Sequence, residues 1–265
     1  MVMPEASHSR TLRAADNEPV PEFATFDGLQ LHYDVRGDGP AVVLLHSLGF
    51  DGDLWSEMGV VDALLDAGRA VVTFDARGHG RSGKPYDSAA YGADAMARDV
   101  SALADELCFD TVDLAAYSMG SYVALGVLQA EARVSRAVLG GVGGAVLRTG
   151  RPDASLFPPA PDEHEAAAWV LERLPYLRAR VERGATDARA LVQVLRAGTV
   201  PADKDFTGVV AAVLLISGTE DDDPAPLAAA IPGANVLRVE ADHASTMNHP
   251  NFVPALVSFL CGGEG

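Results

Sequence analysis

The sequence predicts an α/β fold: a mostly parallel, doubly wound eight-stranded sheet with helices on both faces and a short helical cap. Residues 41–45 are apolar at every position and residues 70–74 at all but Thr73, as is typical of strands buried on both faces. Segments with helical spacing of apolar residues alternate with such runs, which favours parallel strands joined by crossover helices. The 265 residues are enough for one large core.

The N-terminal part of the chain is expected to hold a tail and a hairpin. Residues 1–21 are polar and lack both an apolar stretch and a small-residue cleavage site, so we expect a flexible tail and not a secretory signal. Residues 23–26 and 29–35 alternate about Asp27-Gly28, which is a hairpin pattern.

Strands and helices then alternate along the chain. A helix is expected from near Asp53, and its apolar residues recur on one face. They are Trp55, Met58, Val61, Leu64 and Leu65. Further helices are expected over 93–107 and from Met119, and further strands over 111–117 and 134–142. The last elements are strands over 210–216 and 235–239 and a closing helix over 251–260.

Residues 145–207 break this rhythm. Four prolines stand between positions 152 and 161, and amphipathic helical segments follow over 163–173 and 187–196. We interpret residues 145–207 as a helical cap inserted between strands of one core, which comprises residues 22–144 and 208–262.

Charge and cysteine content limit the classes of partner. The formal net charge of −17 argues against nucleic acid and anionic membranes as partners, and no apolar run is long enough to cross a bilayer. Cys108 and Cys261 lack metal-binding or redox spacing, so we expect reduced structural thiols in a cytoplasmic protein. The sequence leaves a homodimer open.

One stretch carries the strongest chemical signal. The apolar run 114–117 ends at Ser118, and Ala116 and Gly120 leave space beside it. This pattern predicts a strand, a sharp turn that exposes the Ser118 hydroxyl, and a helix whose first N–H groups face the same spot. Such N–H groups stabilise the negative charge that forms on an attacked carbonyl. An isolated match of this kind is also typical of a Ser-Gly turn before an ordinary buried helix.

Three further segments with polar side chains follow predicted strands. They are residues 46–49, 218–224 and 242–243. Ligands and catalytic groups of open α/β sheets gather beyond the carboxyl ends of the strands. A serine nucleophile requires a base near neutral pKa, and that base requires an acidic partner. The chain offers a serine, an acid and a histidine in this order.

These motifs resemble those of the α/β-hydrolase superfamily, and together they cover residues 23–260 apart from the cap. Residues 116–120 resemble the nucleophile elbow G-x-S-x-G, with alanine at the first position. The resemblance implies that Ser118 is the nucleophile, Asp221 the acid and His243 the base. Asp221 matches the family's G-x-x-D after the penultimate strand, and His243 matches its histidine after the last strand.

The sequence leaves alternatives for the acid and the base. Asp222 and Asp223 stand beside Asp221, and an aspartate run after a strand is usually a solvated turn or a helix cap. His249 is a second histidine in the C-terminal region, but it directly precedes Pro250 at a predicted helix start. We therefore interpret His249 as part of that helix start and not as the base.

The oxyanion hole is expected to consist of two backbone N–H groups. One belongs to Met119, and by resemblance to the family's H-G-x-G loop the other belongs to Leu48. Ser47 stands where the family has glycine, which is tolerable if its backbone angles are ordinary. His46 is expected to support this loop and not to act on substrate.

The loop 75–82 matches the family's D-x-R-G-x-G-x-S pattern. We interpret it as structural, with Asp75 and Arg77 holding neighbouring loops by ion pairs. Phosphate binding is disfavoured, because no lysine follows at P-loop spacing.

The function predicted from these residues is hydrolysis of carboxylic esters or lactones through an acyl-enzyme. No metal or organic cofactor is required, and the expected partner is a small-molecule substrate with an acyl group. Tyr117 and Trp169 are predicted to contact that substrate, and apolar cap residues to line its pocket. The loop 46–49 with Trp55 resembles that of 3-oxoadipate enol-lactonases. Alternatives are a cofactor-free perhydrolase, a C–C bond hydrolase, and a non-catalytic binding protein of the same fold.

Overall fold

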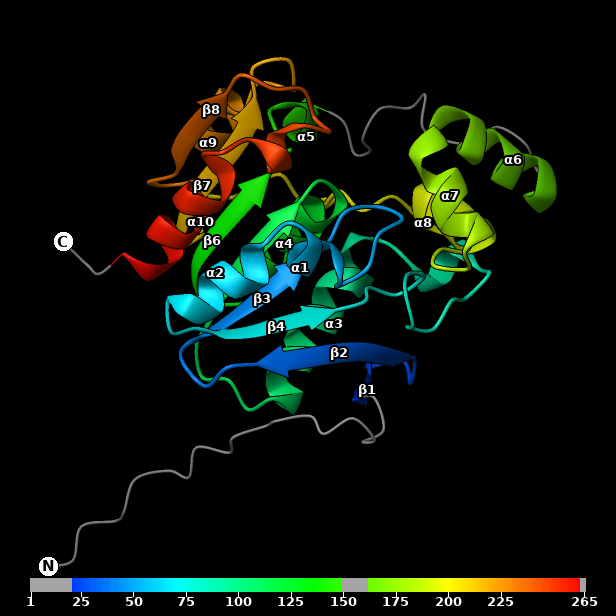
Figure 1. Ribbon diagram of the computed structural model, residues 1–265, viewed down its shortest axis with the longest axis horizontal. Coiled ribbons are helices and arrows are strands. Elements are labelled where there is room, and N and C mark those ends of the chain that lie inside the picture. The colour runs from blue at the N-terminus through cyan, green and yellow to red at the C-terminus, as the bar shows by residue number, and fades with distance from the viewer. Residues whose placement is uncertain (1–20, 149–161, 263–265) are drawn as a thin grey trace, which may run out of the picture.

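The computed structural model describes residues 21–148 and 162–262, and its centre is one eight-stranded sheet (Figure 1). The strand order is β1-β2-β4-β3-β5-β6-β7-β8. Strand β2 pairs antiparallel with β1 and β4, and all other pairs are parallel. The predicted fold class is confirmed. The strands are β1 Glu22–Ala24, β2 Gln30–Arg36, β3 Ala41–Leu45, β4 Ala70–Phe74, β5 Val112–Tyr117, β6 Val134–Gly140, β7 Ala212–Gly218 and β8 Asn235–Val239.

The sheet has an apolar core on each face. Val43 and Leu45 of β3 lie in the cluster that includes helices α3 (Ala93–Glu106) and α4 (Met119–Ala130). Val42 and Leu44 alternate with them and pack on the other face, against α1 (Leu54–Glu57), α2 (Val60–Asp66) and α10 (Phe252–Cys261). All four side chains are 2% exposed or less. Each such burial favours folding by about 1.5–3 kcal/mol before entropy is counted.

The N-terminal hairpin forms as the alternation predicts. Strands β1 and β2 pair about Asp27-Gly28, and Gly28 has φ +84°. The Gly28 N–H donates to the Thr25 carbonyl over 3.0 Å, which closes the turn. A positive φ at this position costs glycine little.

The helix predicted from Asp53 is two helices and not one. Helix α1 ends at Glu57 and α2 begins at Val60, with Gly59 between them at φ +70°. A residue with positive φ interrupts helical hydrogen bonding, so the chain changes direction there. The apolar spacing continues across the break, and Trp55, Val61 and Leu64 are all buried.

Helices between β6 and β7 form a separate apolar cluster, which we call the cap. It comprises α6 (Glu163–Arg173), η3 (Pro175–Leu177), α7 (Arg178–Glu182) and α8 (Ala188–Ala197). Two helix starts follow from capping: the Asp162 carboxylate accepts from the His164 and Glu165 N–H groups, and Asp187 caps α8 in the same way. Residues 1–20 of the tail predicted over 1–21 lie outside the described residues, as do the prolines and apolar residues at 151–161.

The remaining short elements connect these layers. They are η1 (Ser88–Ala90), α5 (Ala145–Arg148), α9 (Ala225–Ala230) and η4 (Thr246–Asn248). In the part of the chain described by the structure, no helix has the length and apolar character to span a bilayer. Cys108 and Cys261 are both exposed free thiols. The expectation that they are structural is therefore wrong, because neither side chain packs in a core.

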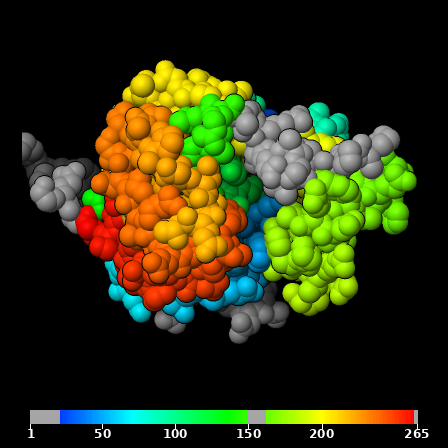
Figure 2. All heavy atoms as spheres, turned by 90° about the horizontal axis from the view of Figure 1, so that it is seen from above, coloured from blue at the N-terminus to red at the C-terminus, as the bar shows by residue number. Residues whose placement is uncertain are grey.

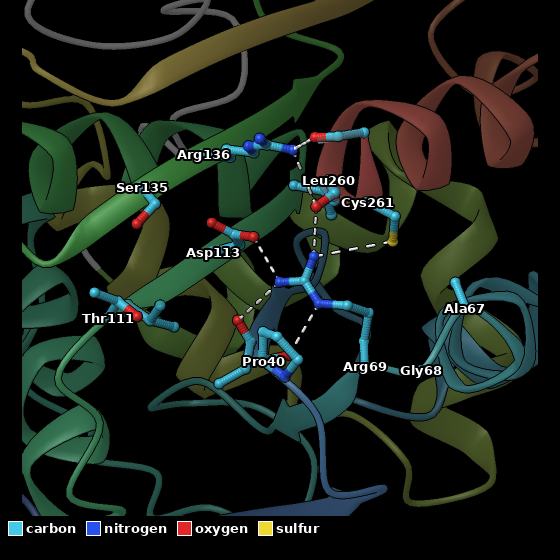
Figure 3. Close-up of a pocket in the computed structure, with 13 residues that line it drawn as sticks. Pro40, Ala67, Gly68, Arg69, Thr111, Asp113, Ser135, Arg136, Leu260 and Cys261 are labelled. Atoms are coloured by element: carbon cyan, nitrogen blue, oxygen red, sulfur yellow. Dashed lines mark hydrogen bonds and ion pairs between the residues drawn. The ribbon is translucent and has the colours of Figure 1, made fainter. Parts of the chain in front are cut away.

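A cavity of about 410 Å³ lies at the amino edge of the sheet, where β3 to β6 begin (Figure 3). Its central side chain is Arg69, which ion-pairs with Asp113 over 2.5 Å. The same guanidinium donates to the carbonyls of Pro40 and of Leu260, at the end of α10. Arg69 thus ties three chain segments together. Ser118 lies at the opposite, carboxyl end of β5.

Candidate active site

Ser118 stands at the sharp turn between β5 and α4. Its backbone angles are φ +53° and ψ −114°, and only Cys108 shares a positive φ among the described non-glycine residues. Such a conformation costs on the order of 1–3 kcal/mol and persists only where the surroundings enforce it. Here the Ser118 N–H donates to the Gly140 carbonyl over 2.8 Å. At Gly120, a Cβ atom would lie 2.1 Å from the Leu45 carbonyl oxygen, so a larger residue cannot follow the turn.

Three side chains from separate strand ends form one hydrogen-bonded chain. The Ser118 Oγ lies 2.9 Å from Nε2 of His243, and Nδ1 of His243 lies 2.8 Å from Oδ2 of Asp221. With its proton on Nδ1, the imidazole donates to Asp221 and accepts from the Ser118 hydroxyl. Ser118 follows β5, Asp221 follows β7, and His243 follows β8. The structure therefore brings together the three residues singled out in the sequence.

The Asp221 carboxylate is held in its charged form. Burial raises the pKa of this group, but the hydrogen bonds from His243 and from the Asp222 N–H lower the pKa by more, and the net pKa lies below its usual value. The Asp222 N–H donates to Asp221 Oδ1 over 2.9 Å. Asp221 is thus a charged acceptor fixed on both oxygens.

The neighbouring alternatives have other partners. The Asp222 carboxylate accepts from the Ala145 N–H over 2.6 Å at the start of α5. The Asp223 carboxylate accepts from Arg238 over 3.0 Å. Nδ1 of His249 accepts from the Asn251 N–H over 3.2 Å just before α10, in agreement with its interpretation as part of the helix start.

Tyr117 holds the loop that carries His243. Its side chain is buried, and its hydroxyl donates to the His243 backbone carbonyl over 2.6 Å. Its ring packs edge-on against Phe252 of α10. This placement does not match the predicted contact with substrate, because strand alternation turns Tyr117 toward the α10 face of the sheet.

Two backbone N–H groups are available as oxyanion donors. Met119 is the first residue of α4, so its N–H has no partner within the helix. Leu48 lies in the loop after β3. Within residues 21–148 and 162–262, neither N–H donates to another group of the protein. Ser47 has no positive φ, which explains why glycine is not required there.

His46 supports the loop that contains Leu48. Its buried ring donates from Nδ1 to the Ser47 carbonyl over 2.9 Å, and Nε2 accepts from the Ala76 N–H over 3.0 Å. Burial lowers the pKa of His46 below its usual value, so the ring stays neutral. The predicted supporting role is confirmed.

The loop 75–82 is structural, as predicted. The Arg77 guanidinium pairs with Asp99 over 2.6 Å and with Asp27 over 2.9 Å. Asp75 accepts from the Gly52 N–H and the Arg81 N–H, both over 2.8 Å. These bonds join the loop to the hairpin, to α3 and to the loop after β3.

The cap lies beside this site. Figure 2 shows a furrow between the orange and red C-terminal elements and the yellow-green helices α6 and α7, with blue atoms at its floor. Trp169 packs half-buried in the cap cluster, with the Arg173 guanidinium 5.6 Å from its ring centre. Its contact with substrate stays a prediction. Among the described residues, no group of three or more His, Cys, Asp or Glu side chains is arranged to hold a metal ion.

Two contacts of the cap were missed from the sequence. Arg180 and Thr186 both donate to the Gly49 carbonyl in the loop that contains Leu48. No local pattern marks either residue, because each stands in or beside a short cap helix whose partner is more than 100 positions away. Only the tertiary structure identifies them.

Comparisons with known proteins agree with this architecture. The non-heme chloroperoxidase CPO-A1 of Kitasatospora aureofaciens is 36% identical over 101 residues, which are 38% of this chain and 35% of that protein. The 2-hydroxy-6-oxononadienedioate/2-hydroxy-6-oxononatrienedioate hydrolase of Klebsiella pneumoniae is 33% identical over 152 residues, which are 56% of this chain and 49% of that protein. The aligned part of this chain thus spans about a third to a half of these relatives.

Solved structures extend the likeness to nearly the whole chain. The enol-lactonase from Burkholderia xenovorans LB400 superposes with a TM-score of 0.71 and 27% identity, covering 91% of this chain and 99% of that one. The model of the alpha/beta hydrolase family matches residues 42–255. That range contains the elbow, both candidate oxyanion donors, Asp221 and His243, and the chain therefore belongs to the alpha/beta hydrolase family.

Proposed function

We propose that this protein hydrolyses carboxylic esters or lactones through an acyl-enzyme on Ser118. The observation that carries the proposal is the continuous chain from the Ser118 hydroxyl through His243 to the Asp221 carboxylate, with 2.9 and 2.8 Å between its polar atoms. This arrangement turns a weak nucleophile into an active one, because a neutral imidazole is in place to take its proton.

Acylation begins when Ser118 Oγ attacks the substrate carbonyl carbon and Nε2 of His243 takes the hydroxyl proton. The Asp221 carboxylate stabilises the imidazolium that forms. The carbonyl oxygen becomes an oxyanion, which accepts hydrogen bonds from the Leu48 and Met119 N–H groups and lies at the positive end of α4. When the tetrahedral intermediate collapses, the C–O bond to the alcohol breaks and Nε2 returns its proton to the leaving oxygen.

Deacylation repeats these steps with water. The imidazole takes a proton from water, the resulting hydroxide attacks the acyl carbon, and Ser118 leaves with the proton from Nε2. An ester yields an acid and a free alcohol. A lactone yields one hydroxy acid, because its leaving oxygen stays attached to the acyl chain. The likeness to the enol-lactonase from Burkholderia xenovorans LB400 supports including lactones.

Perhydrolysis is a second candidate on the same three residues. The identity to the non-heme chloroperoxidase of Kitasatospora aureofaciens favours it. In this reaction hydrogen peroxide replaces water in deacylation, so that the acyl-enzyme yields a peracid and regenerates Ser118. The residues and proton transfers are otherwise unchanged.

A substrate panel tests these proposals. Purified protein is assayed with p-nitrophenyl esters of increasing acyl length, with simple lactones, and with acetate plus hydrogen peroxide. We expect turnover of esters or lactones that Ser118→Ala and His243→Ala each reduce by roughly 10⁴-fold or more. Faster peracid formation than ester turnover would favour perhydrolysis. No turnover of any compound would support a binding role for the site instead.

A further inference from the structure

The cap holds one carbonyl of the loop that follows β3. Nε of Arg180 donates to the Gly49 carbonyl over 2.9 Å, and the Thr186 hydroxyl donates to the same oxygen over 2.6 Å. Arg180 is fixed in turn by its ion pair with Asp51 over 2.6 Å. Its side chain is 12% exposed, and Thr186 is 4% exposed. Both bonds are therefore shielded from competition by water.

Two peptide groups connect this carbonyl with the Leu48 N–H. The Gly49 carbonyl belongs to the same planar peptide as the Phe50 N–H, which donates to the Ser47 carbonyl over 3.1 Å. The Ser47 carbonyl belongs in turn to the same peptide as the Leu48 N–H. A rotation of the Gly49 carbonyl therefore breaks the turn and changes the direction of the Leu48 N–H.

The opposite side of this turn is fixed from the core. Nδ1 of His46 also donates to the Ser47 carbonyl, and its Nε2 is held by Ala76. The Ser47–Leu48 peptide is thus oriented by the core through His46 and by the cap through Gly49. If the cap contacts are lost, the support from His46 remains but the Gly49 carbonyl loses both of its side-chain donors.

Side-chain packing ties the same turn to the cap. Leu48 packs against both the core cluster and the cap cluster. The ring of Phe50 stacks on Tyr176 at 5.8 Å, and the Arg180 guanidinium lies 4.6 Å from the Phe50 ring centre. A Cβ atom on Gly49 would lie 2.2 Å from Leu177, so cap and turn are in direct contact.

We propose that Arg180 and Thr186 are positioning residues for the oxyanion hole, which they complete by orienting the Leu48 N–H through the Gly49 carbonyl. This inference rests on the proposed function, since Leu48 acts only if an oxyanion forms. It assigns the cap a role in transition-state stabilisation beyond covering the site. A cap that only shapes the pocket would change substrate binding and leave kcat unaltered.

The test compares single variants that retain size or charge. Thr186→Val replaces one hydroxyl by a methyl group, and Arg180→Lys keeps the charge beside Asp51 but loses the planar fork. Thr186→Ser keeps the hydroxyl and serves as the rescue variant. The matched control is Arg178→Lys in the same helix, because Arg178 Nε donates to the Leu171 carbonyl inside the cap.

The readouts are kcat and KM for the best ester of the panel and the inhibition constant of phenylboronic acid. Boronic acids add to a serine nucleophile as a tetrahedral species, and one oxygen then occupies the oxyanion position. Complete loss of one oxyanion donor lowers kcat by about 10²–10³-fold. We expect a misdirected donor in Thr186→Val or Arg180→Lys to lower kcat roughly 10-fold with KM within about twofold. The boronate should bind more weakly by the factor lost in kcat/KM.

Thr186→Ser and Arg178→Lys should retain kcat within about twofold of wild type. The inference is overturned if folded Thr186→Val and Arg180→Lys keep wild-type kcat, or if only KM rises. Thermal unfolding shows whether each variant is folded. If Thr186→Val does not fold, the kinetics of Arg180→Lys alone test the inference. An inactive wild-type protein that also fails to bind phenylboronic acid would instead refute the proposed function, so the two failures are distinguishable.

Discussion

The hydroxyl of Tyr117 donates to the backbone carbonyl of His243 over 2.6 Å. Tyr117 directly precedes Ser118, so this bond joins the strand that carries the proposed nucleophile to the loop that carries the proposed base. The His243 side chain is 48% exposed, and the Tyr117 ring packs against its imidazole with 5.5 Å between the ring centres. The position of the imidazole therefore depends on a residue on the α10 face of β5.

Replacing Tyr117 tests this dependence. Tyr117→Phe keeps the ring and removes the hydroxyl, so the free energy of unfolding should fall by about 1 kcal/mol. We expect kcat to fall roughly 10-fold with little change in KM, because the base is less well positioned. The control is Tyr91→Phe, since the Tyr91 hydroxyl donates to the Pro85 carbonyl over 2.7 Å. A similar loss of stability without a loss of kcat is expected there, and equal kcat in both variants would contradict the assignment.

Variants of the adjacent aspartates should separate the proposed acid from its neighbour. Asp221→Asn removes the charge that stabilises the imidazolium and permits the wrong tautomer, so kcat should fall by roughly 10⁴-fold. Asp222→Asn keeps an oxygen for the Ala145 N–H, and kcat should change by less than about threefold. Steady-state ester hydrolysis at pH 7.5 measures both. The reverse order of effects would transfer the role of acid to Asp222.

His79 should make folding sensitive to acid. Burial lowers its pKa to about 3, whereas an unfolded chain titrates near 6.5. Between these values the unfolded state binds a proton that the folded state does not, so stability is complete above pH 6.5 and falls as pH falls, by about 1.4 kcal/mol per pH unit.

Urea unfolding at pH 7.5 and pH 5 measures this loss. His79→Asn retains a side-chain N–H for the Arg77 carbonyl, which His79 Nδ1 contacts over 3.0 Å. The variant should show a smaller decrease in the free energy of unfolding between the two pH values than wild type does. Burial lowers the pKa of His46 in the same direction, so part of the decrease should persist. An unchanged decrease would mean that His79 is protonated in the folded protein.

The ion pair at the amino edge should govern stability without affecting chemistry. Asp113→Ala leaves the Arg69 guanidinium buried without its carboxylate, which should cost about 3–5 kcal/mol. The double variant Arg69→Met with Asp113→Leu should recover most of that loss, because no charge remains buried. Thermal unfolding measures both. Asp113 lies about 17 Å along β5 from Ser118, so kcat below the unfolding transition should match wild type, and a large loss of kcat would contradict this separation.

The elements that sequence patterns predict well are those whose signal is local. Apolar runs, interrupted only by Thr73, mark β3 and β4 because both of their faces are covered. The elbow is recognisable because the turn at Ser118 requires small residues two positions before and after it, at Ala116 and Gly120. The short distance from a Cβ atom on Gly120 to the Leu45 carbonyl shows this requirement. Asp221 is predicted by its match to the family's G-x-x-D after the penultimate strand, but three aspartates in a row carry no local signal that separates them. The tertiary structure does so, through the hydrogen bond of Asp221 to His243 and the approach of Ala145 to Asp222 and of Arg238 to Asp223.

The features that sequence patterns missed depend on tertiary contacts or on backbone angles. The helical spacing of apolar residues continues through Gly59, so this spacing does not indicate the break between α1 and α2. The orientation of Tyr117 follows from strand alternation, which turns its side chain to the face opposite that of Ala116. The bonds of Arg180 and Thr186 to Gly49 exist only because the cap folds over that loop, and residue type and spacing in the cap do not predict them.

The central claim is that Ser118 is a nucleophile activated by His243. The most direct measurement is covalent labelling with a fluorophosphonate, followed by mass spectrometry of the intact protein and its peptides. We expect one label on the peptide that contains Ser118, none in Ser118→Ala, and labelling slowed by at least about 100-fold in His243→Ala. A folded wild-type protein that stays unlabelled, or is labelled equally fast without His243, would contradict the account.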